Sequence, residues 1–236
     1  MDAGGCAELA SLARDRRVVR REGYFQQGDP AEDIYVLCAG HLKMTRFEPS
    51  GEQLILRLIL PGEAFGALDV ETGAGYAACA VALESSHALA WDRRAFDALA
   101  QRYPLLLRNV VRILAERARE LEQRCAELTA ERVPCRLARA LLRLQCQIGR
   151  SAESGVLIGL SREELAQIAG TTLFTVSRLL GEWQDRGLIG ARREAVLVIN
   201  APGLAAIAHE DPLAERTPNI LAANLIAVKD GLAGSR

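Results

Sequence analysis

The sequence predicts an α+β protein whose β-rich N-terminal half is followed by a helical C-terminal half. Between residues 24 and 91, short apolar runs alternate with glycine-containing turns, which is typical of an antiparallel barrel or sandwich. Residues 93–144 contain no glycine and are rich in the helix formers Leu, Ala, Glu and Arg. Two short helical segments joined by a glycine turn then precede a final apolar run. The predicted order is therefore a barrel, a long helix and a winged helix-turn-helix.

Turn signals divide the N-terminal half at short intervals. They are residues 27–30, 39–40, 49–51, 61–62 and 73–75. Val, Ile and Leu concentrate between these turns, in residues 34–37 and 54–56. Strands do not alternate with helices here, so a parallel sheet is not expected.

Composition limits the classes of protein. The 236 residues, half of them hydrophobic, suffice for two domains. The net charge is −1, so a surface that binds nucleic acid must be a local patch. The N-terminus carries acidic residues and arginines where a signal peptide needs an apolar core, and no run is long enough to span a bilayer. We expect a soluble cytoplasmic protein with no membrane partner.

Several kinds of site are not expected. The cysteines are isolated, with no CxxC pair or Cys/His cluster for zinc or iron and sulfur; they are Cys6, Cys38, Cys79, Cys125, Cys135 and Cys146. Reduced, mostly packed thiols are the simplest interpretation. No GxSxG, HExxH or glycine-rich phosphate loop occurs, so we do not expect an enzyme.

A regular apolar spacing marks the long helix. Apolar residues recur at alternating steps of four and three, the 3.5-residue repeat of a coiled coil; they are Leu107, Val111, Leu114, Ala118, Leu121, Cys125 and Leu128. The alternative is a helix packed on its own barrel. Charged residues flank the seam, which favours self-association because a helix wholly buried in one subunit would not tolerate them. Pro134 is expected to end or kink this helix.

The helix-turn-helix prediction depends on capping residues. Ser161 and Glu164 form a capping box, so a helix is expected to begin at Arg162. Gly170 ends this helix, and Thr171 or Thr172 caps the next, whose apolar residues are expected to face inward; these are Val176, Leu179, Leu180 and Trp183. The sequence predicts a small hairpin or wing after this helix. Its apolar strands are residues 188–189 and 196–199, and Arg192 and Arg193 lie in the turn between them.

The second helix and the wing offer groups that suit DNA. Base edges and phosphates require hydrogen-bond donors near the start of a helix and cations nearby; the candidates are Arg162, Thr171, Thr172, Thr175, Ser177, Arg178, Arg192 and Arg193. Residues 132–200 contain ten Arg and six Asp or Glu, a local net charge of +4. A helix-turn-helix pattern alone is weak evidence, since paired short helices also occur in ordinary cores.

These motifs together resemble a known family. The positions that match the family follow one another in the family's order. In the barrel they are Gly28-Asp29, 34–37, Gly40, Lys43, Gly51, 61–63 and Phe65-Gly66, and in the C-terminal half they are 165–171, 175–180 and 187–189. Over roughly residues 20–208 the chain resembles the catabolite-activator/fumarate-nitrate-regulator (CRP/FNR) family of transcription regulators.

The resemblance implies an organisation and partners. We expect a cyclic-nucleotide-binding-like sensor barrel (a double-stranded β-helix) over 1–100, a dimerisation helix over 101–133, a winged helix-turn-helix over 134–208, and a tail of unassigned role over 209–236. It implies a homodimer that binds a palindromic promoter site, RNA polymerase as a partner, and a small-molecule or redox effector. The alternative is a barrel that serves as a ligand-binding or interaction module without promoter function.

The resemblance also assigns positions in the predicted DNA-reading helix. Arg178 matches the family arginine that reads guanine, and Ser177 matches the serine found beside it in some members. The acidic residue usual four positions before that arginine is Phe174 here. A phenyl ring accepts no hydrogen bond from a base amino group, so the half-site is expected to differ near this position.

The sensor departs from members that bind cyclic AMP. Those members carry Gly-Glu for the ribose and Arg-Ser for the cyclic phosphate, where this chain has Gly66-Ala67 and the Tyr76-Ala77 neighbourhood. Without the carboxylate or the arginine, we do not expect cyclic AMP to bind. Leu121 and Glu122 stand where those members place two hydroxyl residues. The iron–sulfur version is not expected either, because its N-terminal cysteine cluster is missing.

Four alternatives remain for the effector: haem, another small molecule, a thiol sensor or none. His87 and Cys79 are candidate haem ligands, and His41 is a further barrel histidine. Cys125, on the seam, is a candidate redox sensor, against the simpler interpretation of packing.

Overall fold

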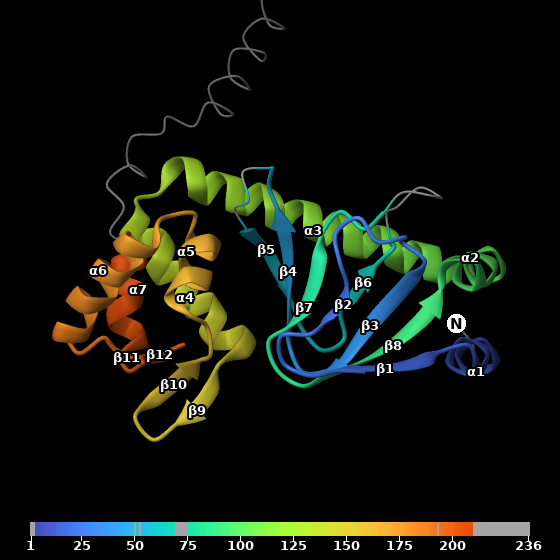
Figure 1. Cartoon of the computed structure of the whole chain (residues 1–236), viewed down its shortest axis with the longest axis horizontal. Coiled ribbons are helices and arrows are strands. Elements are labelled where there is room, and N and C mark those ends of the chain that lie inside the picture. The colour runs from blue at the N-terminus through green and yellow to red at the C-terminus, as the bar shows by residue number, and fades with distance from the viewer. Residues whose placement is uncertain (1–2, 50, 52, 69–74, 193, 210–236) are drawn as a thin grey trace, which may run out of the picture.

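The strands of the N-terminal half form two antiparallel sheets that face each other (Figure 1). The computed structural model describes residues 3–49, 51, 53–68, 75–192 and 194–209. The tail from residue 210 and residues 73–74 of the turn predicted over 73–75 therefore lie outside the described residues. The sheets have the orders β1-β8-β3-β6 and β2-β7-β4-β5. The strands are β1 (Arg14–Val18), β2 (Gly23–Phe25), β3 (Asp33–Ala39), β4 (Leu42–Phe47), β5 (Gln53–Ile59), β6 (Ala64–Gly66), β7 (Cys79–Ala82) and β8 (Ser86–Asp92). The predicted β-rich domain is confirmed.

Strand alternation builds the core of this domain. In β8, Ser86, Ala88 and Ala90 are buried and the residues between them are half-buried, as successive side chains point to opposite faces. Aromatic rings with centroids 3.7 to 6.2 Å apart fill the core; they belong to Tyr24, Phe25, Tyr35, Phe65 and Tyr76. Gly40 allows a tight turn next to this core, because it has φ +81° and a Cβ there would lie 2.7 Å from the Ser85 carbonyl oxygen.

Helices dominate the rest of the described chain. They are α1 (Ala3–Ser11), α2 (Arg93–Arg102), α3 (Pro104–Ala130), α4 (Val133–Ile148), α5 (Arg162–Ala169), α6 (Leu173–Asp185) and α7 (Ala201–His209). Helix α3 runs along the barrel and continues to the second domain (Figure 1). None of the described helices has the length and apolar character needed to cross a membrane.

The break between α3 and α4 falls earlier than the sequence predicts. Helix α3 ends at Ala130, and Pro134 lies in the first turn of α4 instead of ending α3. Proline is tolerated there because the first turn of a helix leaves its N–H groups without intrahelical partners. Pro134 therefore starts the second domain's first helix.

Helix α3 presents two adjacent rows of side chains. Seam residues Leu107, Val111 and Leu121 are 57, 59 and 63% exposed. The neighbouring row faces the protein itself: Arg117 donates to the Ala64 carbonyl, and Glu127 is only 9% exposed. Part of the charge expected to surround the seam in solvent is therefore packed against the same chain. The helix packs on its own barrel and also keeps an apolar row exposed.

The second domain has its own core and sheet. Strands β9 (Arg150–Ala152), β10 (Gly155–Ile158), β11 (Ile189–Arg192) and β12 (Ala195–Val198) form a sheet of order β11-β12-β10-β9. The predicted wing is the β11–β12 hairpin. Buried residues from α4, α5, α6 and α7 pack over this sheet in one cluster.

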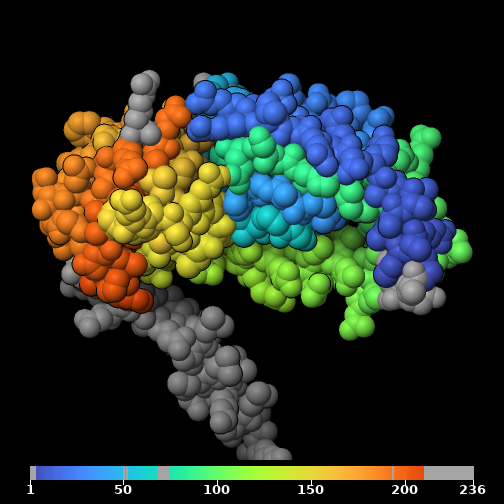
Figure 2. Space-filling view, turned by 90° about the horizontal axis from the view of Figure 1, so that it is seen from below, coloured from blue at the N-terminus to red at the C-terminus, as the bar shows by residue number. Residues whose placement is uncertain are grey.

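Ion pairs connect the two domains, which lie side by side in Figure 2. Lys43 on β4 contacts Glu164 on α5 at 2.6 Å, and both side chains are largely buried. The wing residue Glu194 accepts from Arg20 and Arg21 in the β1–β2 turn, at 3.3 and 3.1 Å. These contacts hold the helix-turn-helix against the barrel.

We expect the Lys43–Glu164 contact to stabilise this arrangement in a pH-dependent way. Burial opposes ionisation of Glu164, but hydrogen bonds from Lys43 and Ser161 outweigh it and lower the pKa below the ordinary 4.5. Because the folded-state pKa is the lower one, the contribution is complete above pH 4.5 and is lost as the pH falls through the folded-state value.

A double-mutant cycle of Lys43→Met and Glu164→Gln measures this contribution by thermal unfolding. Glutamine keeps the capping box with Ser161, so the cycle isolates the interdomain contact. The coupling is expected to be about 1–2 kcal/mol at neutral pH and much smaller once the pH is below the folded-state pKa of Glu164. A neutral-pH coupling near zero would show that the pair does not hold the domains together.

Candidate functional site

The helix-turn-helix is built by local capping. Ser161 accepts from the Glu164 backbone N–H while the Glu164 carboxylate accepts from the Ser161 N–H, which forms the predicted capping box. Gly170 ends α5 in the left-handed conformation at φ 60°, ψ 51°. Thr172 caps α6 by accepting from the Thr175 N–H at 3.2 Å. The predicted helix boundaries and caps are therefore observed.

Helix α6 has a buried face and an exposed face. Val176, Leu179, Leu180 and Trp183 are all buried in the domain core, as the sequence predicts. Phe174, near the start of the helix, is 78% exposed. The Arg178 guanidinium is about half exposed and contacts Glu182 one turn later at 2.5 Å. An exposed surface ion pair of this kind contributes little, so Arg178 can exchange Glu182 for an external acceptor.

The other predicted contact residues are distributed around α6. Thr172 is exposed, and its hydroxyl lies 2.9 Å from that of Thr175, so both hydroxyls are already engaged in the cap. Thr171 and Ser177 are half-buried, whereas Arg162 at the start of α5 is exposed. These residues lie within the helix-turn-helix, but not all of them have a free side chain.

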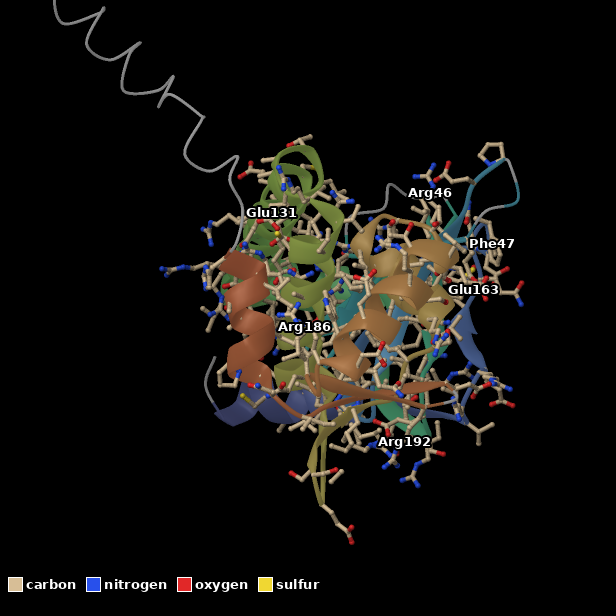
Figure 3. All side chains as sticks on the ribbon, turned by 90° about the vertical axis from the view of Figure 1, so that its left-hand side faces the viewer. Arg46, Phe47, Glu131, Glu163, Arg186 and Arg192 are labelled. Atoms are coloured by element: carbon tan, nitrogen blue, oxygen red, sulfur yellow. The ribbon has the colours of Figure 1, made fainter. Side chains whose placement is uncertain are left out.

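The wing lies at the edge of the same domain. Arg192 is exposed at the end of β11 (Figure 3), and Arg193 lies outside the described residues. Sequence reasoning missed Arg20 and Arg21, which contact Glu194 in the wing turn and bring positive charge beside it. The arginine-rich run of residues 14–21 was the available signal. Only the fold places that run beside the wing.

The predicted effector-pocket residues converge inside the barrel. The Tyr76 hydroxyl and the Ala67 N–H both donate to the Asp33 carbonyl, each at 3.0 Å. A Cβ on Gly66 would lie 2.6 Å from the same oxygen. Tyr76 is buried and stacks on Phe25 with centroids 3.7 Å apart, while Ala77 is exposed. A phenolic ring thus occupies the place that the sequence compares with a phosphate-binding arginine.

The Tyr76 ring is uncharged at neutral pH, because a phenol has an ordinary pKa of 10.0 and burial raises the pKa of Tyr76 from that value. Burial raises the pKa of Tyr35 as well. Neither phenol therefore ionises near neutral pH. The residues at the two matched positions, Ala67 and Tyr76, offer neither a carboxylate for a ribose nor a cation for a phosphate.

The haem hypothesis finds no support in the geometry. Cys79 lies on β7 of one sheet and its sulfur accepts from the Gln27 N–H, whereas His87 lies on β8 of the other sheet and contacts Asp15 at 2.5 Å. His41 contacts Glu84 at the same distance of 2.5 Å, beside the second domain. These side chains have separate partners and do not form one ligand set.

The chain is similar to known proteins over both domains. Residues 16–103 match the family model of the cyclic nucleotide-binding domain, and residues 135–207 match that of the Crp-like helix-turn-helix domain. The transcriptional regulatory protein btr of Bordetella pertussis is 33% identical over 208 residues, which cover 86% of this chain and 85% of that protein. The cyclic AMP receptor protein of Thermus thermophilus is 34% identical over 165 residues, which cover 70% of this chain and 74% of that protein.

A solved structure agrees with these matches. The crystal structure of TTHB099, a CRP-family transcriptional regulator from Thermus thermophilus, has a TM-score of 0.72 and 28% sequence identity. The match covers 82% of this chain and 96% of that one. The order of barrel, long helix and helix-turn-helix is thus shared with a known regulator.

We expect Gly170→Ala to destabilise the helix-turn-helix by about 1–2 kcal/mol, because an L-residue in the left-handed conformation is strained. A Cβ at Gly170 would also lie 2.4 Å from the Leu128 side chain. Gly181→Ala is the control, since Gly181 lies inside α6 and its Cβ would meet no atom within 4 Å. Chemical denaturation should show stabilisation of up to about 1 kcal/mol for the control. Equal effects of the two substitutions would contradict the assigned cap.

Proposed function

The chain belongs to the CRP/FNR family of bacterial transcription regulators, and we propose that it binds a palindromic promoter site as a homodimer. The observation that best supports this proposal is the outward face of α6. Phe174 and Arg178 are exposed there, while Val176 and Leu179 hold the helix in its domain. A helix held in this way enters the major groove without rearranging its own core.

The dimer is proposed to form through α3. Large apolar side chains exposed in a row are unfavourable for an isolated chain, and the 3.5-residue spacing suits a partner helix. The exposed Leu107, Val111, Leu121 and Leu128 belong to this row. The half-sites of the palindrome would then lie about one turn of DNA apart, roughly 34 Å, as for other helix-turn-helix dimers.

Each residue has a proposed role on DNA. Arg178 releases Glu182 and donates two hydrogen bonds to guanine O6 and N7. Phe174 contacts an apolar group such as a thymine methyl. Arg162 and Arg192 lie where phosphates are the expected partners. RNA polymerase is the proposed further partner, as expected for a regulator that acts at promoters.

The effector is proposed to differ from cyclic AMP. A cyclic phosphate placed at Tyr76 would lose its hydration and meet a neutral phenol in place of a guanidinium. Ala67 likewise offers no carboxylate to the ribose hydroxyl.

Site selection on random DNA duplexes is expected to distinguish residues that contact bases from residues that contact only phosphates. Arg178→Ala should weaken the specific site by about 1–3 kcal/mol per half-site and flatten the preference at one G·C pair. Arg192→Ala should weaken all sequences alike and lower the salt slope by about one unit. Phe174→Glu should move the preferred half-site towards that of members with the acid. An unchanged preference in both Arg178→Ala and Phe174→Glu would mean that α6 is not the reading helix.

Placing charge on the seam is expected to give monomers. Val111 and Leu121 are among its most exposed residues, so Val111→Glu/Leu121→Glu would put like charges face to face across the axis. Arg119→Glu, on an exposed part of α3 outside the seam, is the control for the added charge. Sedimentation should give monomers for the first variant and dimers for the second. A dimer that survives the double substitution would exclude this seam.

Titration calorimetry tests the proposed ligand preference. Cyclic AMP is expected to produce no saturable heat at concentrations far above the micromolar range. Ala67→Glu/Tyr76→Arg restores the two missing groups and tests whether they suffice for binding. Saturable micromolar binding to the unaltered protein would overturn the pocket argument.

A further inference from the structure

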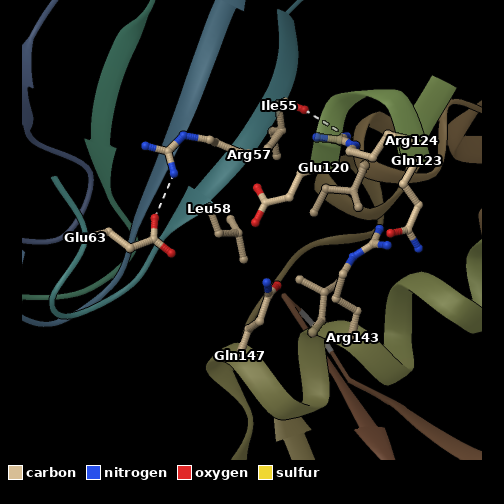
Figure 4. A pocket seen from close by; sticks show the side chains of 11 residues that line it. Ile55, Arg57, Leu58, Glu63, Glu120, Gln123, Arg124, Arg143 and Gln147 are labelled. Atoms are coloured by element: carbon tan, nitrogen blue, oxygen red, sulfur yellow. Dashed lines mark hydrogen bonds and ion pairs between the residues drawn. The ribbon is translucent and has the colours of Figure 1, made fainter. Parts of the chain in front are cut away.

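A polar cavity lies where the barrel, α3 and the second domain meet, outside the aromatic core of the barrel (Figure 4). Its volume is about 160 Å³. The barrel contributes β5 and the turn after it, α3 contributes one face of its last third, and the second domain contributes α4 and α5. The charged and amide side chains of the lining are Arg57, Glu63, Glu120, Gln123, Arg124, Arg143 and Gln147.

Arginines reach this cavity from three separate elements. Arg57 extends from β5 and pairs with Glu63 at 2.7 Å. Arg124 extends from α3 and donates to the backbone carbonyls of Ile55 and Leu56, so these hydrogen bonds bring it no carboxylate. Arg143 extends from α4 and donates to both carboxylate oxygens of Glu127, each at 3.5 Å. Glu127 and Glu120 also act on Arg124 through their charge. The lining still contains three arginines against two glutamates, which leaves one positive charge in excess.

The two guanidiniums also oppose each other. Burial, together with the nearby Arg143 charge, lowers the pKa of Arg124. An anion between like charges removes this repulsion and gains charge-assisted hydrogen bonds. The arrangement therefore favours a negatively charged occupant on the α3–α4 side of the cavity.

The opposite side of the cavity requires a hydrogen-bond donor. Figure 4 shows the Glu120 carboxylate pointing into the space between Arg57 and Gln147. No hydrogen bond or ion pair of Glu120 occurs among the described residues. A bare anion would face this carboxylate and be repelled, whereas hydroxyl groups would donate to it. The complementary ligand has an anionic end and hydroxyls a few atoms away.

We propose that this junction cavity binds a small hydroxylated anion, of the sugar-phosphate or hydroxycarboxylate class, between Arg124, Arg143 and Glu120. Such a ligand touches α3 and α4 through these three side chains, and it lies against β5, whose Ile55 and Arg57 line the same cavity. Binding of the ligand therefore stabilises one relative orientation of the two domains. The ligand shifts this equilibrium only by the difference between its affinities for the two orientations. This control is separate from any ligand inside the barrel.

Calorimetry on the full chain, without DNA, tests the proposal with four probes. Glycerol 3-phosphate and tartrate carry both an anion and hydroxyls, inorganic phosphate carries only the anion, and glycerol carries only hydroxyls. We expect saturable binding of glycerol 3-phosphate or tartrate, weaker binding of phosphate and none of glycerol. Whichever of glycerol 3-phosphate and tartrate binds more tightly shows whether the anion is a phosphate or a carboxylate. Absence of saturable binding for both would overturn the proposal.

Variants then locate the site. Arg143→Gln should weaken binding about tenfold or more, while Arg143→Lys, which keeps the charge, should weaken it less. Arg143→Gln removes a partner of the buried Glu127 and could prevent folding. In that case Arg124→Gln tests the same site, because it removes the guanidinium that α3 offers to the anion. Glu120→Gln should narrow the preference for glycerol 3-phosphate over phosphate. Arg119→Gln, an exposed α3 residue outside the cavity, should bind as the unaltered protein does. Binding that is equal in all variants would place the ligand elsewhere and overturn the proposal.

Discussion

The architecture depends on one helix that serves two surfaces at once. Helix α3 has 27 residues and is therefore about 40 Å long. One row of its side chains is tied to the barrel, where Arg117 and Arg124 donate to backbone carbonyls of Ala64 and Leu56. The adjacent row is apolar and exposed. Because both rows share one rigid backbone, a partner that packs on the second row is positioned relative to the barrel that packs on the first.

The junction between the domains combines apolar packing with ion pairs. Leu58, Leu60 and Leu83 of the barrel pack against the core of the second domain, and charged side chains lie around them. Three groups of charged side chains lie at this junction. They are Lys43 with Glu164, Arg20 and Arg21 with Glu194, and the arginines of the junction cavity. Polar contacts of this kind are individually weak and respond to pH, salt and small ions. A domain arrangement held in this way can be shifted by a ligand without unfolding either core. The proposed anion site lies at this junction, between β5, α3, α4 and α5.

Local patterns in the sequence were sufficient for the order of the domains and for the bounds of α5 and α6. The 3.5-residue repeat, the Ser161–Glu164 capping box and the left-handed Gly170 all depend on residues within a few turns of one another. The burial of Trp183 follows from helical periodicity alone. Family resemblance added the roles proposed for Arg178 and Phe174, since a base contact has no local pattern in the sequence.

Tertiary structure decided how distant charges are used. Lys43 and Glu164 are 121 residues apart in the chain, and nothing near either one indicates the other as a partner. The charges beside the seam divide between solvent and the barrel, and the break between α3 and α4 falls before Pro134, which lies in the first turn of α4. The sequence by itself determined periodicity and caps, because these depend on near neighbours. Only the fold determined which arginines meet at the junction, because that depends on how two independently packed cores come together.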